Sequence, residues 1–142
     1  MTVVPAQTTA AEVMALAPDG TAVAAIEIAR KGEYQTCVWD VATAKPRAIL
    51  HMRCNSLAFS PDGKTLAVGS GEPSRGGDIT LWDIHSGKLI KNYAERHLDS
   101  VFALDFTPDG KLLASCSGWT ESPIRLWDVG TGAEVGRLEG HR

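Results

Sequence analysis

The stretch Phe59–Gly71, FSPDGKTLAVGSG, decides how the chain folds. Its Gly63-Lys64-Thr65 looks like the end of a phosphate-binding loop, which would make the chain a nucleotide-hydrolysing enzyme. Such a loop needs a glycine five residues earlier, where this chain has Ala58, and it must open a helix. Pro61 removes a backbone N–H donor, and the following TLAVGS reads as a strand. The stretch therefore predicts a tight turn between two strands.

The same turn sequence occurs three times, within one repeated unit. Pro-Asp-Gly begins at Pro18, Pro61 and Pro108, so the repeat periods are 43 and 47 residues. A Trp-Asp pair follows the proline after 21, 21 and 19 residues, at Trp39-Asp40, Trp82-Asp83 and Trp127-Asp128. Regular spacing of this kind is typical of proteins built by repeating one supersecondary unit.

Each unit predicts a four-stranded antiparallel meander. A short alternating segment precedes every Pro-Asp-Gly, and a period of two is typical of a half-buried strand. Proline and glycine suit the turn, because proline presets its own φ and glycine accepts a positive one. A second apolar strand, a variable loop, a third strand with Trp-Asp and a less apolar fourth strand follow. We expect an all-β fold with units at 13–53, 54–98 and 99–142, after an N-terminal segment or extra strand at 1–12.

Composition narrows the class of protein. The 142 residues carry a net charge of −3, which argues against a nucleic-acid partner. No window approaches about 18 consecutive apolar residues, so no membrane span is expected, and the N-terminus lacks the features of a secretory signal. Cys37, Cys54 and Cys116 are widely spaced among apolar neighbours, which fits buried thiols in a reducing compartment rather than a metal site. We therefore expect a cytoplasmic protein without a metal or cofactor.

The segments PDGKTLAVGS…DITLWDIHSGKL and HLDSVFALDFTPDGKLLASCS…IRLWDVGTGAEVGRLEGH resemble blades of the WD-repeat β-propeller family. The resemblance covers nearly the whole chain from about residue 13 onward. It implies three four-stranded blades that stack radially around a channel. It also gives structural roles to the repeated residues Trp39, Trp82, Trp127, Asp40, Asp83 and Asp128.

In this family a buried hydrogen-bond network joins a His, an Asp, a Ser or Thr of the second strand, and the Trp of Trp-Asp. The third unit offers His97, Ser115 or Ser117, and Trp127, with Glu121 where the Asp is expected. The corresponding residues of the other units match less well: Gly76 with an offset His51 in the second, Glu33 with Gln7 in the first. We expect the network to be incomplete in every unit.

The resemblance places the variable loops 29–35, 71–78 and 117–123 on one rim of the propeller. Loops on a rigid scaffold are the usual seat of recognition. Trp119 lies outside the repeat pattern; it is either an aromatic anchor at a protein interface or a cover for its own loop. The candidate partner-binding residues are Trp119, Glu121, Arg30, Lys31, Glu72 and Arg75. His51, His85, His97 and His141 fall at repeat positions or in turns, and no unrepeated catalytic constellation accompanies them, so we expect no enzyme.

Three blades do not close a ring, because propellers have about four to eight. One solution is head-to-tail assembly of identical chains, a dimer with six blades at about 60° each or a trimer with nine at about 40°. His141 would then serve the first blade of the next chain, which has Gln7 in the His position. The alternative is that the chain is part of a longer propeller, because it stops just after Gly140-His141, with which a further repeat would begin.

The pattern thus predicts a non-catalytic WD-repeat scaffold that binds itself and an unknown protein or peptide. A propeller that binds a small ligand or a glycan is a second possibility. It would need aromatic and polar residues at corresponding places in every blade, and Trp119 has no such counterparts.

Overall fold

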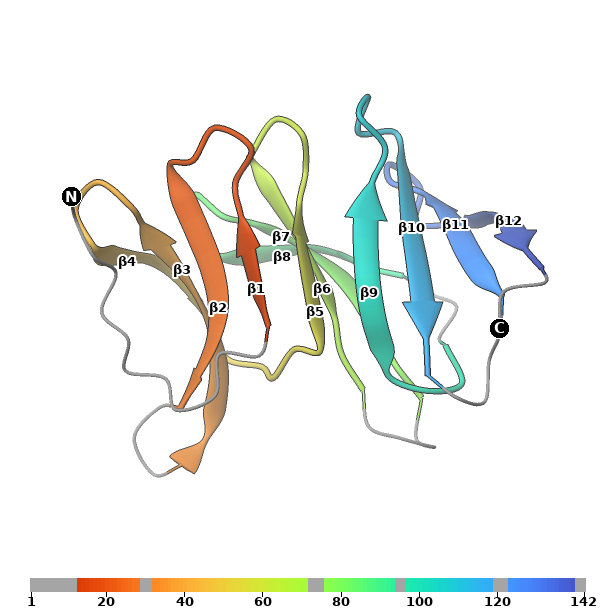
Figure 1. Cartoon of the computed structure of the whole chain (residues 1–142), viewed down its shortest axis with the longest axis horizontal. Helices are drawn as coiled ribbons and strands as arrows, with labels where there is room; N and C mark the ends of the chain where they lie inside the picture. The colour runs from red at the N-terminus through yellow and green to blue at the C-terminus, as the bar shows by residue number, and fades with distance from the viewer. Residues whose placement is uncertain (1–12, 29–31, 72–75, 94–96, 119–122, 140–142) are drawn as a thin grey trace.

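The computed structural model describes residues 13–28, 32–71, 76–93, 97–118 and 123–139. These residues form three four-stranded antiparallel sheets, each built from consecutive strands (Figure 1). The first sheet has β1 (Met14–Leu16), β2 (Ala22–Ile28), β3 (Tyr34–Asp40) and β4 (Lys45–Leu50). The second has β5 (Ser56–Phe59), β6 (Thr65–Gly69), β7 (Ile79–Asp83) and β8 (Lys88–Asn92). The third has β9 (Val101–Phe106), β10 (Leu112–Ser117), β11 (Ile124–Asp128) and β12 (Glu134–Leu138). We call them blades 1, 2 and 3.

The blades stand side by side, with blade 2 between the other two (Figure 1). Their first strands lie together on one side of the molecule, because β5 contacts both β1 and β9. The all-β architecture agrees with the sequence prediction. No helix long and apolar enough to cross a membrane occurs in the described ranges.

The Pro-Asp-Gly segments form the tight turns between the first and second strands. Gly20, Gly63 and Gly110 have φ values of 75°, 71° and 72°, the left-handed conformation that glycine adopts without a steric penalty. In the second turn, Asp62 Oδ1 accepts the N–H of Lys64 at 2.9 Å. Thr21 and Lys111 donate in the same way to Asp19 and Asp109, so all three turns have the same construction.

Strand pairing gives each blade two chemically different faces. The tryptophan face is the one that carries Trp39, Trp82 or Trp127. Its aligned residues are Leu16, Val23 and Trp39 in blade 1, Phe59, Leu66 and Trp82 in blade 2, and Phe106, Leu113 and Trp127 in blade 3. The alanine face is the opposite one. Its aligned residues are Ala15, Ala24 and Val38 in blade 1, Ala58, Ala67 and Leu81 in blade 2, and Asp105, Ala114 and Leu126 in blade 3.

The core lies between blades rather than within them. One apolar cluster joins the alanine face of blade 1, including Ala24 and Val38, to Leu66 and the half-buried Trp82 of blade 2. The second cluster joins the alanine face of blade 2 to Trp127 on the tryptophan face of blade 3, so both interfaces pair the same two kinds of face. Small residues on one face therefore receive large residues of the next blade, which brings successive sheets into close contact.

The three cysteines do not share one environment. Cys37 and Cys54 are buried, as the sequence predicts. Cys116 is half-buried, because no other described part of the chain packs against the alanine face of its blade. The prediction of a buried thiol was therefore wrong for Cys116.

Candidate interaction surfaces

Blade 3 contains a buried hydrogen-bond network centred on a hydroxyl group. Trp127 Nε1 donates to Ser115 Oγ at 2.7 Å, and His97 Nε2 lies 2.7 Å from the same oxygen. All three side chains are almost completely buried. His97 also forms two backbone hydrogen bonds with Gly77, both 3.0 Å long, and these join blade 3 to the connection before β7. The network therefore stabilises blade 3 and its contact with blade 2. Because its side chains are buried in the core, it is a structural network and not a binding site.

The other two blades use different chemistry at the same place. In blade 2, Val68 occupies the position that corresponds to Ser115, and Trp82 Nε1 instead donates to Thr80 Oγ1 of its own strand at 2.9 Å. Blade 1 has Ala25 and Cys37 at the two corresponding positions, so neither offers a hydroxyl acceptor to Trp39. The repeated tryptophan thus has a hydroxyl acceptor at these positions in blades 3 and 2 but not in blade 1.

The aspartates that follow the tryptophans cap the turns between the third and fourth strands. Asp83 Oδ1 accepts the N–H groups of His85 and Ser86 at 2.8 and 3.0 Å. These backbone hydrogen bonds hold the pKa of Asp83 below its ordinary value. Asp40 and Asp128 have similar partners and lowered pKa values, Asp40 chiefly through the guanidinium of Arg47. All three carboxylates are therefore committed to turn geometry.

Blade 1 leaves its tryptophan face open within the described structure. Met14, Leu16 and Ile49 on this face are 66%, 60% and 42% exposed. Cys37 lies beneath them, and burial raises the pKa of its thiol to about 12. Side chains of this size are normally covered when they line up on one face of a sheet.

Blade 3 leaves its alanine face open as far as the described residues reach. Ala103, Ala114, Cys116 and Ile124 of this face line a shallow hollow of about 180 Å³. The two open faces are of the kinds that pack together at both interior interfaces. One difference is Asp105, which stands where blades 1 and 2 have Ala15 and Ala58.

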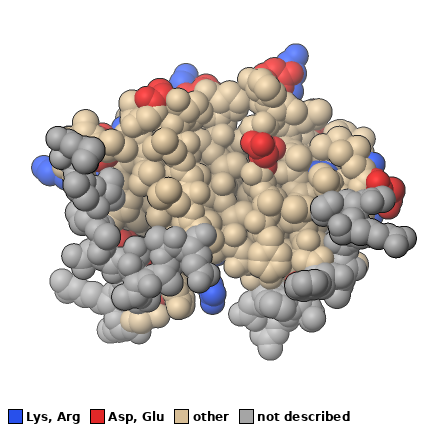
Figure 2. Space-filling model, in the orientation of Figure 1, with Lys and Arg blue, Asp and Glu red and all other residues tan. Residues whose placement is uncertain are grey.

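The side of the molecule on which β1, β5 and β9 lie is mostly uncharged. Figure 2 shows acidic and basic side chains mainly around its margin, with one acidic patch near the upper middle. This side corresponds to the channel wall of a propeller.

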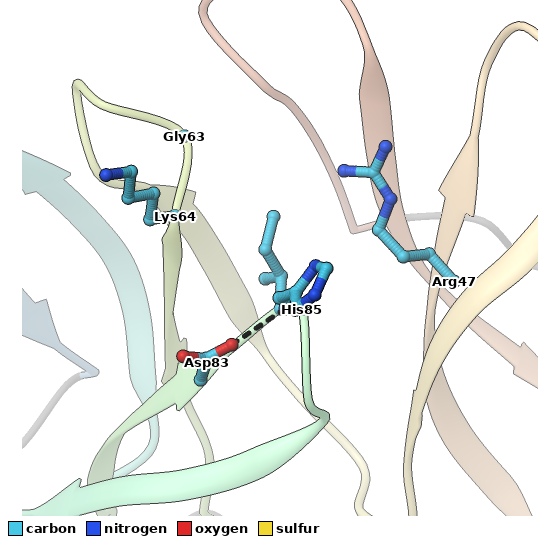
Figure 3. Close-up of a pocket in the computed structure, with 6 residues that line it drawn as sticks. Arg47, Gly63, Lys64, Asp83 and His85 are labelled. Carbon is cyan, nitrogen blue, oxygen red and sulfur yellow. Dashed lines mark hydrogen bonds between the residues drawn. The ribbon is translucent and has the colours of Figure 1, made fainter.

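A pocket of about 280 Å³ lies at the end where the Pro-Asp-Gly turns gather, between blades 1 and 2 (Figure 3). Its lining includes Arg47, Lys64, Asp83 and His85. Arg47 and His85 face one another, but Lys64 extends away from Arg47. Arg47 already donates to Asp40 at 3.1 Å. The cations of Arg47 and Lys64 do not converge, and the carboxylate of Asp83 caps a turn. The pocket is therefore not arranged to bind an anion.

A second pocket, of about 430 Å³, lies at the opposite end, where the first strands begin. Its lining comes from all three blades: Val13, Ile26, Tyr34, Arg53, Cys54, Asn55 and Phe102. The Arg53 guanidinium carbon stands 4.7 Å from the centre of the Tyr34 ring. We call this site the loop-end pocket.

The predicted partner-binding residues lie outside the described residues. These are Trp119, Glu121, Arg30, Lys31, Glu72 and Arg75, and the same holds for His141. The described structure does place Tyr34, Arg53 and Phe102 at the end of the molecule on which the predicted loops begin. The sequence did not indicate these three as a site, because they lie in three separate segments that only the folded blades bring together.

The family model described as "WD domain, G-beta repeat" matches residues 45–83 and 87–122, more than half of the chain. The chain therefore belongs to the WD-repeat family.

Two of the relatives that the chain resembles are larger proteins. It is 32% identical over 111 residues to WD repeat and SOCS box-containing protein 1 of Danio rerio, which covers 74% of this chain and 25% of that protein. It is 40% identical over 86 residues to cilia- and flagella-associated protein 52 of Chlamydomonas reinhardtii, which covers 58% and 14%. The chain thus spans a quarter or less of these relatives.

The crystal structure of the RRP9 WD40 repeats has the same fold. It superposes with a TM-score of 0.78 at 22% identity, over 99% of this chain and 42% of that one. The match covers all three blades.

Proposed function

We propose that this chain is a non-catalytic WD-repeat scaffold that assembles head to tail with copies of itself and presents its loop end to a protein partner. The observation that supports it most is the pairing of faces. Both interior interfaces join an alanine face to a tryptophan face, and one face of each kind is left open. A second copy offers each open face the surface it packs against inside the molecule.

The interface would be heterologous, because two different faces meet. Such contacts form rings when the rotation closes, so a dimer of six blades or a trimer of nine is the expected product. WD-repeat relatives of this chain carry many more residues than these three blades, which is consistent with a need for further blades around the channel.

Two substitutions test this arrangement. Leu16→Asp places a charge on the open tryptophan face, and Ala114→Asp places one on the open alanine face. Each variant alone should be monomeric, because every contact in a head-to-tail ring uses one face of each kind. An equimolar mixture should form a one-to-one dimer, since each variant retains the face that the other has lost. Light scattering behind a sizing column reports both masses.

Leu98→Asp is the matched control, because Leu98 is 65% exposed in the connection before β9 and belongs to neither open face. It should assemble as the wild type does. A mixture of the two face variants that stays monomeric would contradict head-to-tail association, whatever the wild type does. Association of either variant alone would show that a different surface is used.

A further inference from the structure

The loop-end pocket joins aromatic, apolar and cationic groups from three blades. Tyr34 is 41% exposed and Phe102 is 50% exposed, although large aromatic side chains are usually covered in a folded domain. Ile26 and Val13 add apolar side chains to the lining of the same pocket. The volume of about 430 Å³ is within the range of pockets that bind small molecules or peptide side chains.

Arg53 supplies a positive charge at the edge of this pocket. Its guanidinium carbon lies over the Tyr34 ring, 4.7 Å from the ring centre, and this contact favours the observed position of the exposed cation. Among the described residues no carboxylate forms an ion pair with Arg53. A guanidinium that is held in position before binding loses less conformational freedom when it pairs with a carboxylate, and it pairs through two parallel hydrogen bonds.

Asn55 supplies a polar group beside Arg53. Its Nδ2 donates to the carbonyl oxygen of Gly71 at 2.7 Å, which orients the side-chain amide. No hydrogen bond from a described residue reaches the Oδ1 atom of the same amide, which can act as an acceptor for an N–H group. A peptide backbone provides such N–H groups on both sides of an internal side chain.

We propose that the loop-end pocket binds a peptide segment in which an Asp or Glu side chain lies next to a large apolar residue. The carboxylate pairs with Arg53, the apolar side chain packs against Phe102 and Ile26, and Asn55 accepts a backbone N–H of the peptide. This inference rests on the proposed scaffold function, but every group that it uses belongs to one copy of the chain. It therefore does not depend on self-assembly.

A defined peptide array tests the proposal. The probes are acetylated, amidated nonapeptides with Glu, Gln or Lys at the centre, Leu, Phe or Ser on either side, and Gly-Ser elsewhere. The full chain should bind the Glu peptides with Leu or Phe neighbours and discriminate at least tenfold against the matching Gln peptides. Fluorescence anisotropy with the best labelled peptide then gives dissociation constants for the variants.

Arg53→Gln should weaken this peptide at least tenfold, and Phe102→Ala should weaken it without removing the preference for Glu over Gln. Lys64→Gln removes the same charge from an exposed position at the opposite end, so it should bind as the wild type does. Equal binding of Glu and Gln peptides, no binding of any probe at about 1 mM, or an unaffected Arg53→Gln would overturn the proposal. A peptide whose only carboxylate is its C-terminus, bound more tightly than the internal Glu peptide, would overturn the assignment to an internal acid.

The masses of the same variants separate this proposal from self-assembly. Arg53→Gln should keep the mass of the wild type, because Arg53 lies on neither open face. Loss of peptide binding at unchanged mass locates the effect in the pocket. A wild type that assembles but binds no probe removes the pocket proposal alone, and a monomer that binds the Glu peptides removes self-assembly alone.

Discussion

The hydroxyl of Ser115 joins two ring nitrogens in the core of blade 3. It accepts from Trp127 Nε1 and lies at hydrogen-bond distance from His97 Nε2. Replacing it by alanine leaves two buried polar nitrogens without their shared partner. We expect Ser115→Ala to lower the free energy of unfolding by about 2–3 kcal/mol, because each unsatisfied buried group costs about 1–3 kcal/mol. Urea denaturation measures the change.

The matched variant is in blade 2, where Thr80 Oγ1 accepts from Trp82 Nε1 alone. Trp82 is only half-buried, so water can replace part of the lost hydrogen bond. We expect Thr80→Val to cost about 1 kcal/mol. Equal losses of unfolding free energy in the two variants would show that the network around Ser115 stabilises the protein no more than a single hydrogen bond does.

Single residues mark the limit of prediction from the sequence. His97, Ser115 and Trp127 could be named together because the family pattern fixes their spacing. Thr80 as the partner of Trp82 could not, because it acts from the same strand and outside that pattern. Arg53 and Tyr34 are 19 residues apart, Tyr34 at the start of β3 and Arg53 in the connection after β4, and only the folded blade shows their contact.

At the scale of strands, the close approach of blades 2 and 3 requires glycine in β6. A Cβ on Gly69 would lie 2.8 Å from Val101 Cγ1 of blade 3, and it would come still closer to Ser56 Oγ of the neighbouring strand β5. Ser56 Oγ in β5 also donates to the carbonyl oxygen of Val101 in β9 at 2.8 Å, so β5 and β9 cannot separate without losing this hydrogen bond. We expect Gly69→Ala to cost about 1–3 kcal/mol of unfolding free energy, which is the usual cost of overpacking.

Gly136 in β12 is the control for this substitution. The nearest atom to a Cβ there is Leu126 Cδ1 at 3.8 Å, an ordinary contact. Gly136→Ala should change stability by no more than about 0.5 kcal/mol. If both alanine variants behave alike, close packing at Gly69 does not explain the interface.

The repeated turns give the protein an acid-sensitive stability. Hydrogen bonds lower the pKa of Asp19 through Thr21, of Asp62 through Ser60 and of Asp109 through the N–H of Lys111. A lowered pKa in the folded state means that the stabilisation is present above the unfolded value of about 3.9 and is lost as the pH falls through the folded values. We expect the urea midpoint to be nearly constant at neutral pH and to fall below about pH 4.

Changing the three Pro-Asp-Gly aspartates, Asp19, Asp62 and Asp109, to asparagine tests whether they cause this pH dependence. Asparagine can still accept the backbone N–H but does not titrate. The triple variant should show a smaller fall in midpoint between about pH 5 and pH 3 than the wild type. An identical fall would place the acid sensitivity in other carboxylates.

At the scale of the whole molecule, the reactivity of Cys116 shows whether the open alanine face is covered. It is half-buried there, while Cys37 and Cys54 are buried and burial raises the pKa of both thiols. We expect a thiol reagent at neutral pH to modify Cys116 first, and to do so more slowly as the protein concentration rises and the face is covered. Ala114→Asp, which prevents assembly, should remove the concentration dependence.

The repeated unit made the blades predictable, because turn glycines and alternating strands are local features. The two chemically different faces of each blade could not be read so directly, since they depend on the register between strands. The pairing of Ala24 with Val38 and of Val23 with Trp39 shows which residues share a face. Because this alternation repeats, the face left open on blade 1 is of the kind that packs against the face left open on blade 3.

The most direct measurement is the solution mass of the unmodified chain by light scattering behind a sizing column, over a range of protein concentrations. One chain has a mass of 15.1 kDa. Head-to-tail closure predicts a discrete species of two or three times that mass. A well-behaved monomer at every concentration would contradict it.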